Sequence, residues 1–111
     1  MHKCKKLLLL SVALWASSVV ASTQTGKVVS INVREDGLHW FYVSGTRTTK
    51  PACATSSESY WIIKDENSTA GKSQLSVLLS AYMAGKEVVI QGRDTCVRWG
   101  DGEDISAVML R

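Results

Sequence analysis

The sequence predicts a small, mainly β domain with a single α-helix. Three observations support this. Runs of β-branched and aromatic residues, bounded by turn residues, recur along the chain as they do in short strands. One segment alone, Lys72 to Gly92, begins with apolar residues at helical spacing and passes through a glycine into a strand-like run. Two cysteines, Cys53 and Cys96, lie in polar segments that each follow a predicted strand.

The first 21 residues have the layout of a secretory signal peptide. A basic segment, His2 to Lys6, precedes an apolar run from Leu7 to Ala16, and small residues lead to a cut after Ala21. The alternative, an uncleaved signal anchor, would need a longer run, since a membrane-spanning helix takes about 20 residues. We expect residues 22–111 to form one secreted or periplasmic domain without a membrane span.

The chain after this leader is nearly neutral. Three of the 13 lysines and arginines lie in the leader and all ten acidic residues follow it, which leaves ten charges of each sign. Charges of opposite sign alternate, without the basic stripe that salt-dependent DNA binding requires. Nucleic acid is therefore not an expected partner.

Cys53 and Cys96 are the cysteines that remain after the leader, and in a small exported domain they most simply form one disulfide. On a loop-entropy argument such a bridge stabilises the fold by about 4 kcal/mol. No CxxC motif is present, and His39 is the one histidine left, so we expect neither a metal nor another cofactor.

The predicted elements follow in order. In the first strand, from Thr23 to Val33, Val29, Ile31 and Val33 alternate with polar residues, so one face is expected to be buried. A polar turn ending at Gly37 suits a hairpin. The second strand runs over 38–44 with aromatic residues on both faces, and the third over 60–65.

The helix comes next. Leu75, Leu78, Leu79, Tyr82 and Met83 are expected to form one apolar stripe. Ser68 and Thr69 precede it as N-cap residues, and Gly85 follows at the position of a left-handed C-cap. A fourth strand over 86–93, a loop over 94–103 and a fifth strand over 104–110 complete the chain.

Three strands, a helix and two strands in about 90 residues is the order of the OB-fold, a five-stranded Greek-key barrel with its helix between strands three and four. The cysteines provide an independent check. In that fold, strands two and four run in the same direction, so the loops that carry Cys53 and Cys96 lie at the same end of the barrel.

Motifs of enzymes are weak in this sequence. Gly71-Lys72-Ser73 resembles the end of a P-loop, but Glu66 stands where that motif requires glycine, so the segment is interpreted as the start of the helix. Asp101 to Asp104 lacks the ligand spacing of a calcium loop and is interpreted as a solvated turn. We predict a structural His39 and a protein that is not an enzyme.

Aromatic residues are the best candidates for binding. Trp40, Tyr42, Tyr60 and Trp61 lie in the second and third strands, which carry the usual ligand face of an OB-fold, and Trp99 lies in the later loop. We select Trp40, Tyr42 and Trp61 as the ligand-binding residues, through ring stacking. The alternative is that these side chains fill the core of a small barrel.

The chain resembles known proteins in two segments: Leu78 to Lys86, leading into Val88-Val89-Ile90, and Cys96 to Glu103. In these it is similar to small exported proteobacterial proteins of unassigned role. More distantly it resembles the B subunits of AB5 toxins, of the subtilase-cytotoxin and pertussis-like kind. That second resemblance implies a ring of five chains, with the helices around a pore, and glycan binding. The sugar-contacting serine-and-acid loop of those subunits matches no segment here.

We therefore expect an exported, non-catalytic binding module whose ligand is a glycan or another exported protein, and which assembles as a homo-oligomer, a pentamer in this analogy. The alternative is an accessory subunit in the periplasm that binds a protein and no small ligand. Small residues on the helix, Val77, Ala81 and Ala84, would allow several helices to pack closely around a ring axis. We prefer the alternative that the helix closes the end of its own barrel.

Overall fold

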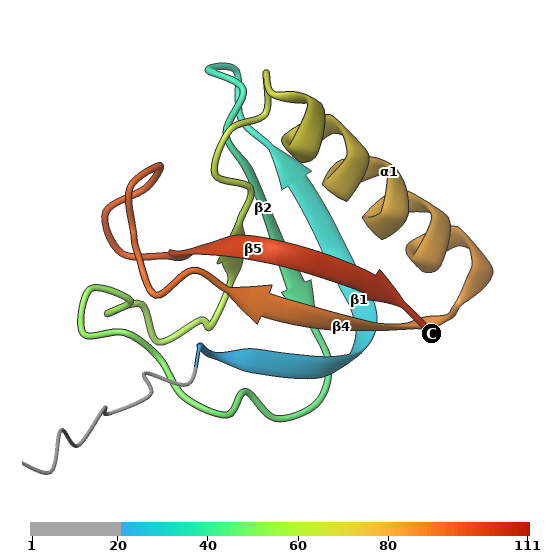
Figure 1. The fold of residues 1–111 in the computed structure, drawn as a ribbon, viewed down its shortest axis with the longest axis horizontal. Helices are drawn as coiled ribbons and strands as arrows, with labels where there is room; N and C mark the ends of the chain where they lie inside the picture. The colour runs from blue at the N-terminus through green and yellow to red at the C-terminus, as the bar shows by residue number, and fades with distance from the viewer. Residues whose placement is uncertain (1–20) are drawn as a thin grey trace, which may run out of the picture.

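A computed structural model of the chain describes residues 21–111, which form a closed five-stranded barrel with one helix (Figure 1). Residues 1–20 of the predicted leader lie outside the described residues. The elements are β1 (Thr23–Val33), β2 (His39–Val43), β3 (Trp61–Ile62), α1 (Thr69–Ala84), β4 (Glu87–Gly92) and β5 (Glu103–Leu110). Around the barrel the order is β1-β2-β3-β5-β4, with β3 and β5 parallel and the other neighbours antiparallel. The predicted OB-like fold class is confirmed.

β1 closes the barrel because it belongs to both halves of the sheet. Its first part, 23–27, pairs with β4, and its second part pairs with β2 from Val28 onward. Gly26 lies at the junction, where a Cβ would come within 2.0 Å of the Ser44 carbonyl oxygen. A side chain at this position would push β1 away from the end of β2.

The predicted burial of Val29 and Val33 is wrong, since their exposed fractions are 58% and 64%. The pairing register with β2 shifts between Val28 and Ser30, which interrupts the alternation that the sequence suggests. As a result Val28 lies in the core and Ile31 packs against it, while Val33 lies at the end of the strand.

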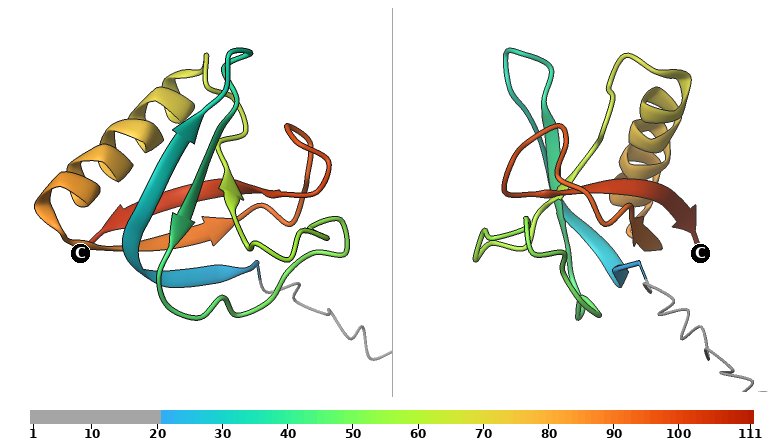
Figure 2. Two further views of the ribbon diagram at one scale, coloured as in Figure 1. Left: turned by 180° about the vertical axis from the view of Figure 1, so that it is seen from behind. Right: turned by 60° about the vertical axis from the view of Figure 1, so that its left-hand side comes forward.

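α1 packs against β1, β5 and β4 and covers one end of the barrel (Figure 2). Leu78 and Ala81 enter the core beside Phe41 and Trp61. The predicted apolar stripe is partly wrong: Leu79, Tyr82 and Met83 are exposed, Met83 to 81%. The helix contacts the barrel along the narrower line of Gly71, Leu78 and Ala81, so only one edge of the stripe is buried.

The ends of α1 are those that the sequence predicts. The Gly71 amide donates to the Ser68 side chain at 3.0 Å, and Gly85 adopts a left-handed conformation with φ of 63°. A Cβ on Gly71 would lie 1.9 Å from the Asp65 carbonyl oxygen. This glycine therefore allows the first turn of the helix to lie against the preceding loop.

Cys53 and Cys96 form the predicted disulfide, with their Cα atoms 6.0 Å apart. The bridge joins the segment between β2 and β3 to the segment between β4 and β5. Both segments lie on the side of the molecule away from α1 (Figures 1 and 2). A disulfide is typical of proteins in an oxidising compartment, in agreement with the predicted export.

A buried ion pair closes the barrel at this side. Arg47 Nη2 lies 2.6 Å from Glu103 Oε1, and the two side chains are 6% and 0% exposed. The guanidinium carbon lies 3.6 Å from the centre of the Trp61 ring. Glu103 Oε2 accepts the Asp94 amide at 3.0 Å, and Gly92 leaves the room for this carboxylate that any Cβ would occupy.

The prediction that residues 101–104 form a solvated turn is therefore wrong at its last three positions, since Gly102 is already buried. Glu103 and Asp104 are fully buried and belong to β5. β3 is also shorter than predicted and consists of Trp61 and Ile62 alone. The Ile63 amide still donates to the His39 carbonyl at 3.2 Å, so the chain continues alongside β2 after the strand has ended.

Removal of one partner of the buried pair should destabilise the domain strongly. We expect Arg47→Met to lower the free energy of unfolding by about 3–5 kcal/mol, because Glu103 would remain charged without its partner. The double variant Arg47→Met with Glu103→Gln should recover part of this loss. Urea unfolding followed by tryptophan fluorescence measures both, with Arg93→Met at an exposed arginine as the control. Equal effects of Arg47→Met and Arg93→Met would contradict this prediction.

Candidate functional site

The candidate site is the outer face of β2 and β3. Successive residues of a strand point to opposite sides, so β2 places Phe41 and Val43 in the core and Trp40 and Tyr42 outside the barrel. The register agrees, since Trp40 pairs with Asn32 and Tyr42 with Ser30 on β1. Trp40 and Tyr42, the two residues of β2 predicted to bind a ligand, are half-buried, so part of each side chain remains accessible.

Trp61, the third predicted binding residue, lies on the other side of the sheet. Its ring is fully buried in the barrel, and its indole nitrogen donates to Gln24 Oε1 at 2.8 Å. Gln24 is in turn held by its amide nitrogen, which donates to the Val43 carbonyl at 2.8 Å. Trp61 therefore cannot share an outer surface with Trp40, and it is removed from the candidate site. On the outer side of the sheet, the short β3 places Ile62, which is itself covered by the surrounding rings.

Four aromatic rings form a continuous cluster on the outer face. Trp40 meets Trp99 edge to face with the ring centres 5.8 Å apart, and Trp99 stacks on Tyr60 at 5.0 Å. Tyr60 then meets Tyr42 edge to face at 6.1 Å. Beneath them lie Leu38 and Ile62, both fully buried. We call these four rings, Trp40, Tyr42, Tyr60 and Trp99, the aromatic face.

Trp99 reaches the aromatic face because a buried carboxylate organises its loop. Asp104 accepts the hydroxyl of Thr95 at 2.7 Å and the backbone amides of Val97 and Arg98 at 2.8 and 3.2 Å. Several donors on one carboxylate hold the segment in a single conformation. The disulfide at Cys96 adds a covalent anchor inside the same segment.

Arg98 connects this loop to the segment between β3 and α1 and, by a longer contact with Asp36, to the hairpin between β1 and β2. Arg98 donates to both carboxylate oxygens of Glu66, at 2.8 and 3.0 Å, and this holds the pKa of Glu66 below its ordinary value. Arg34 pairs with Asp36 at 2.7 Å and lies 5.3 Å from the centre of the Trp99 ring. The hydrogen bond from Arg34 likewise holds the pKa of Asp36 far below its ordinary value.

Carboxylates flank the other side of the aromatic face. The hydroxyl of Tyr42 donates to Glu58 at 2.7 Å, and this hydrogen bond raises the pKa of the phenol. The hydroxyl of Tyr60 donates to Asp101, and burial together with this bond raises its pKa. Both phenols therefore stay protonated at neutral pH and donate to these carboxylates. Glu58 is exposed, and its carboxylate has a second oxygen that can accept a hydrogen bond.

His39 lies in the hairpin and contacts its own turn. Its Nδ1 donates to the Gly37 carbonyl at 2.7 Å. Within residues 21–111 no cluster of three or more histidine, cysteine, aspartate or glutamate side chains has the arrangement of a metal site. In the same part of the chain, no helix is long and apolar enough to cross a membrane.

Sequence reasoning named Trp99 as an aromatic candidate but did not place it in the binding site, and it missed Arg34, Glu58 and Asp101. The local pattern contains no signal that could have found them. Glu58 meets Tyr42 across 16 positions and Asp101 meets Tyr60 across 41, so only the folded chain brings them together.

Comparison with protein-family models, with curated proteins and with solved structures finds no match. The assignment to an OB-like barrel therefore rests on the strand order and pairing.

The Arg98–Glu66 pair predicts a dependence of stability on pH. Because the folded state lowers the pKa of Glu66 from an ordinary value near 4.5, its contribution is complete well above pH 4.5 and is lost as the pH falls through the folded value. At pH 7 we expect the natural chain to be more stable than Glu66→Gln by less than about 1 kcal/mol, because the pair is partly solvated. This difference in the free energy of unfolding should shrink as the pH falls from 7 to 3. Urea unfolding across this range measures it, with Glu87→Gln as control. An advantage that does not change with pH would contradict the prediction.

Proposed function

We propose that the protein is an exported, non-catalytic binding module whose aromatic face binds a glycan. The observation that carries this proposal is the pair Trp40 and Tyr42, which β2 holds on the outside of the barrel against two supporting rings. Aromatic rings offer flat apolar surface to the C–H face of a sugar, and nearby polar groups orient its hydroxyls.

The supporting residues make the surface rigid. Trp99 is engaged by Tyr60 in a stacked pair and by the Arg34 guanidinium, so we assign it to positioning Trp40 rather than to the ligand. Glu58 and Arg34 border the two ends of the cluster and supply an acceptor and donors. A preorganised surface loses little conformational entropy when a ligand binds.

The resemblance to AB5 B subunits supports the same choice of ligand class. It implies glycan binding by an exported OB-fold module, and the barrel described above fits such a protein, although the disulfide links different loops from those it links in the B subunits. Export rests on the predicted leader together with the disulfide.

Glycan-array screening of the chain from Ser22 onward, followed by calorimetry with the best ligand, tests the proposal. We expect Trp40→Ala to weaken binding at least about tenfold, equivalent to about 1.4 kcal/mol. Tyr42→Phe should weaken it less, since the ring remains and only the contact of the hydroxyl with Glu58 is lost.

Tyr82→Ala is the matched control, because this exposed tyrosine lies on α1 and outside the aromatic face. Circular dichroism shows whether each variant keeps its fold. An array without any bound glycan, or equal binding by folded Trp40→Ala and Tyr82→Ala, would overturn the proposal.

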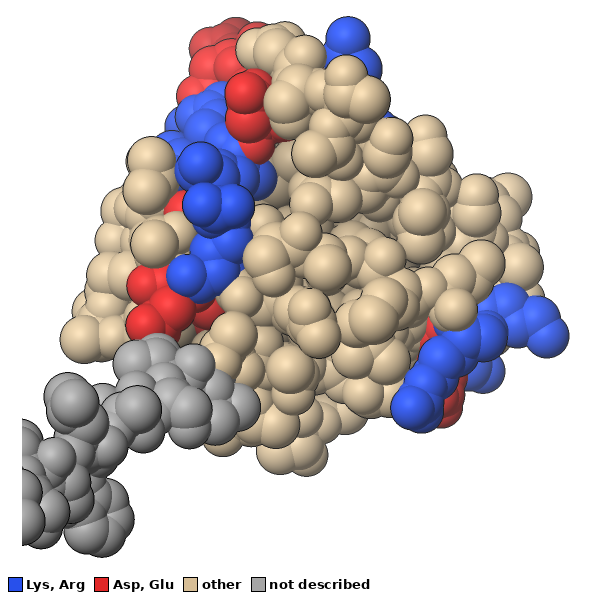
Figure 3. Space-filling model, in the orientation of Figure 1, with Lys and Arg blue, Asp and Glu red and all other residues tan. Residues whose placement is uncertain are grey.

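A second candidate function, an interaction subunit, is favoured by a different surface. Figure 3 shows a broad face without charged side chains over β4, β5 and the neighbouring part of α1. Its strand residues include the outward pairs Val89 with Met109 and Gln91 with Ala107. On α1, exposed serines interrupt the apolar residues Leu79 and Met83. Such a surface suits contact with protein, including other copies of this chain.

The mass of the purified chain in oxidising buffer, from size-exclusion chromatography with light scattering, tests this candidate. An interface between copies should give several chains, five in the B-subunit analogy, and the double variant Val89→Glu with Met109→Glu should return one chain. A single-chain mass for the natural protein would contradict the ring.

A further inference from the structure

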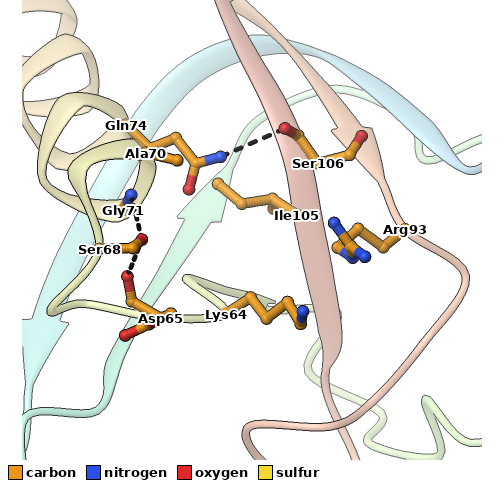
Figure 4. A pocket seen from close by; sticks show the side chains of 9 residues that line it. All are labelled: Lys64, Asp65, Ser68, Ala70, Gly71, Gln74, Arg93, Ile105 and Ser106. Atoms are coloured by element: carbon orange, nitrogen blue, oxygen red, sulfur yellow. Dashed lines mark hydrogen bonds between the residues drawn. The ribbon is translucent and has the colours of Figure 1, made fainter.

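A pocket of about 230 Å³ lies beneath the first turns of α1 and outside the aromatic face (Figure 4). It is formed where four segments meet: the chain after β3, the start of the helix, the chain after β4, which carries Arg93, and β5. Ile105 and Gly71, both buried, supply its apolar and backbone surface. The remaining lining is polar: Lys64, Asp65, Ser68, Gln74, Arg93 and Ser106, with Ala70 at the helix.

Two cations share one side of this pocket. Figure 4 shows the ammonium end of Lys64 and the guanidinium of Arg93 beside β5, while Asp65 lies on the opposite side below α1. Neither Lys64 nor Arg93 takes part in any of the ion pairs formed among residues 21–111. Two cations that line one pocket and form no ion pair among the described residues favour an anion, which offsets both charges and accepts hydrogen bonds from both.

The opposite side of the pocket provides acceptors. The Gln74 amide nitrogen donates to the Ser106 carbonyl at 3.2 Å, and this contact orients the side chain so that its oxygen points into the pocket (Figure 4). Asp65 uses Oδ1 to accept the Asn67 amide at 3.0 Å and retains its other oxygen. The hydroxyl of Ser68 is already occupied, since it donates to the Asp65 carbonyl and accepts the Gly71 amide.

We propose that this pocket binds a compact oxyanion, a carboxylate, phosphate or sulfate group, between Lys64 and Arg93. The oxyanion faces the two cations, and any hydroxyls of the ligand donate to Gln74 and Asp65. The volume is that of a small molecule rather than a polymer, so a long glycan would place one terminal acidic unit here. This site shares no residue with the aromatic face.

Nuclear magnetic resonance of the ¹⁵N-labelled domain, titrated with sodium phosphate, sodium sulfate or sodium glucuronate at constant ionic strength set by chloride, tests the proposal. The reporters are the amides of Gly71 and Ser106 and the side-chain amide of Gln74. We expect saturating shifts at these groups. Lys64→Gln and Arg93→Gln should each raise the dissociation constant at least fivefold.

Lys72→Gln is the matched control, because Lys72 is an exposed lysine on the first turn of α1 that does not line the pocket. Lys72→Gln removes one positive charge near the pocket, as Lys64→Gln and Arg93→Gln do, but it removes no group that lines the pocket. Unchanged thermal unfolding of each variant shows that the fold is intact.

The titrations also distinguish the source of the oxyanion. Tighter binding of glucuronate than of phosphate and sulfate assigns the site to a carboxylate carried by a sugar. The reverse order assigns it to a free tetrahedral oxyanion, and both results support the proposal. Three results would overturn the proposal. The shifts do not saturate, or Lys72→Gln weakens binding as much as Lys64→Gln and Arg93→Gln do, or glucose, the uncharged counterpart of glucuronate, binds as tightly as glucuronate.

Discussion

The buried pair of Arg47 and Glu103, stacked against Trp61, is the contact on which the closed end of the barrel depends. It joins the segment after β2, β3 and β5, which are far apart in sequence and neighbours in space. Burial of two charges carries a large desolvation cost, which only good geometry and further hydrogen bonds offset. At the second carboxylate oxygen of Glu103, the Asp94 amide supplies such a hydrogen bond, and Gly92 leaves room for the carboxylate.

This internal contact determines which surface is left for binding. Because Trp61 occupies the interior with Arg47, the outer side of the same short sheet is left to Trp40, Tyr42 and Ile62. The neighbouring acid in β5, Asp104, holds the loop that carries Trp99 over these residues. Adjacent carboxylates of one strand thus perform different tasks: Glu103 closes the barrel, and Asp104 builds the supporting half of the aromatic face.

The two proposed sites use different physical interactions on different parts of the fold. The aromatic face offers apolar rings with a few oriented polar groups, which suits a neutral sugar. The pocket under α1 offers two cations opposite two acceptors, which suits an acidic group. A binding module with both could recognise two parts of one ligand or two ligands, and the separate readouts of Trp40 and of the α1 amides distinguish these cases.

The sequence by itself determined the elements and their order, because these depend on local patterns. Alternation in β2 placed Trp40 and Tyr42 on one side, Ser68 and Gly85 marked the ends of α1, and two cysteines implied one bridge. Only the tertiary structure decided that Val29 is exposed, that Trp61 is internal and that Glu103 is buried. The reason is physical: Arg47, the partner that offsets the cost of burying Glu103, lies 56 positions away, and no local pattern encodes such a contact.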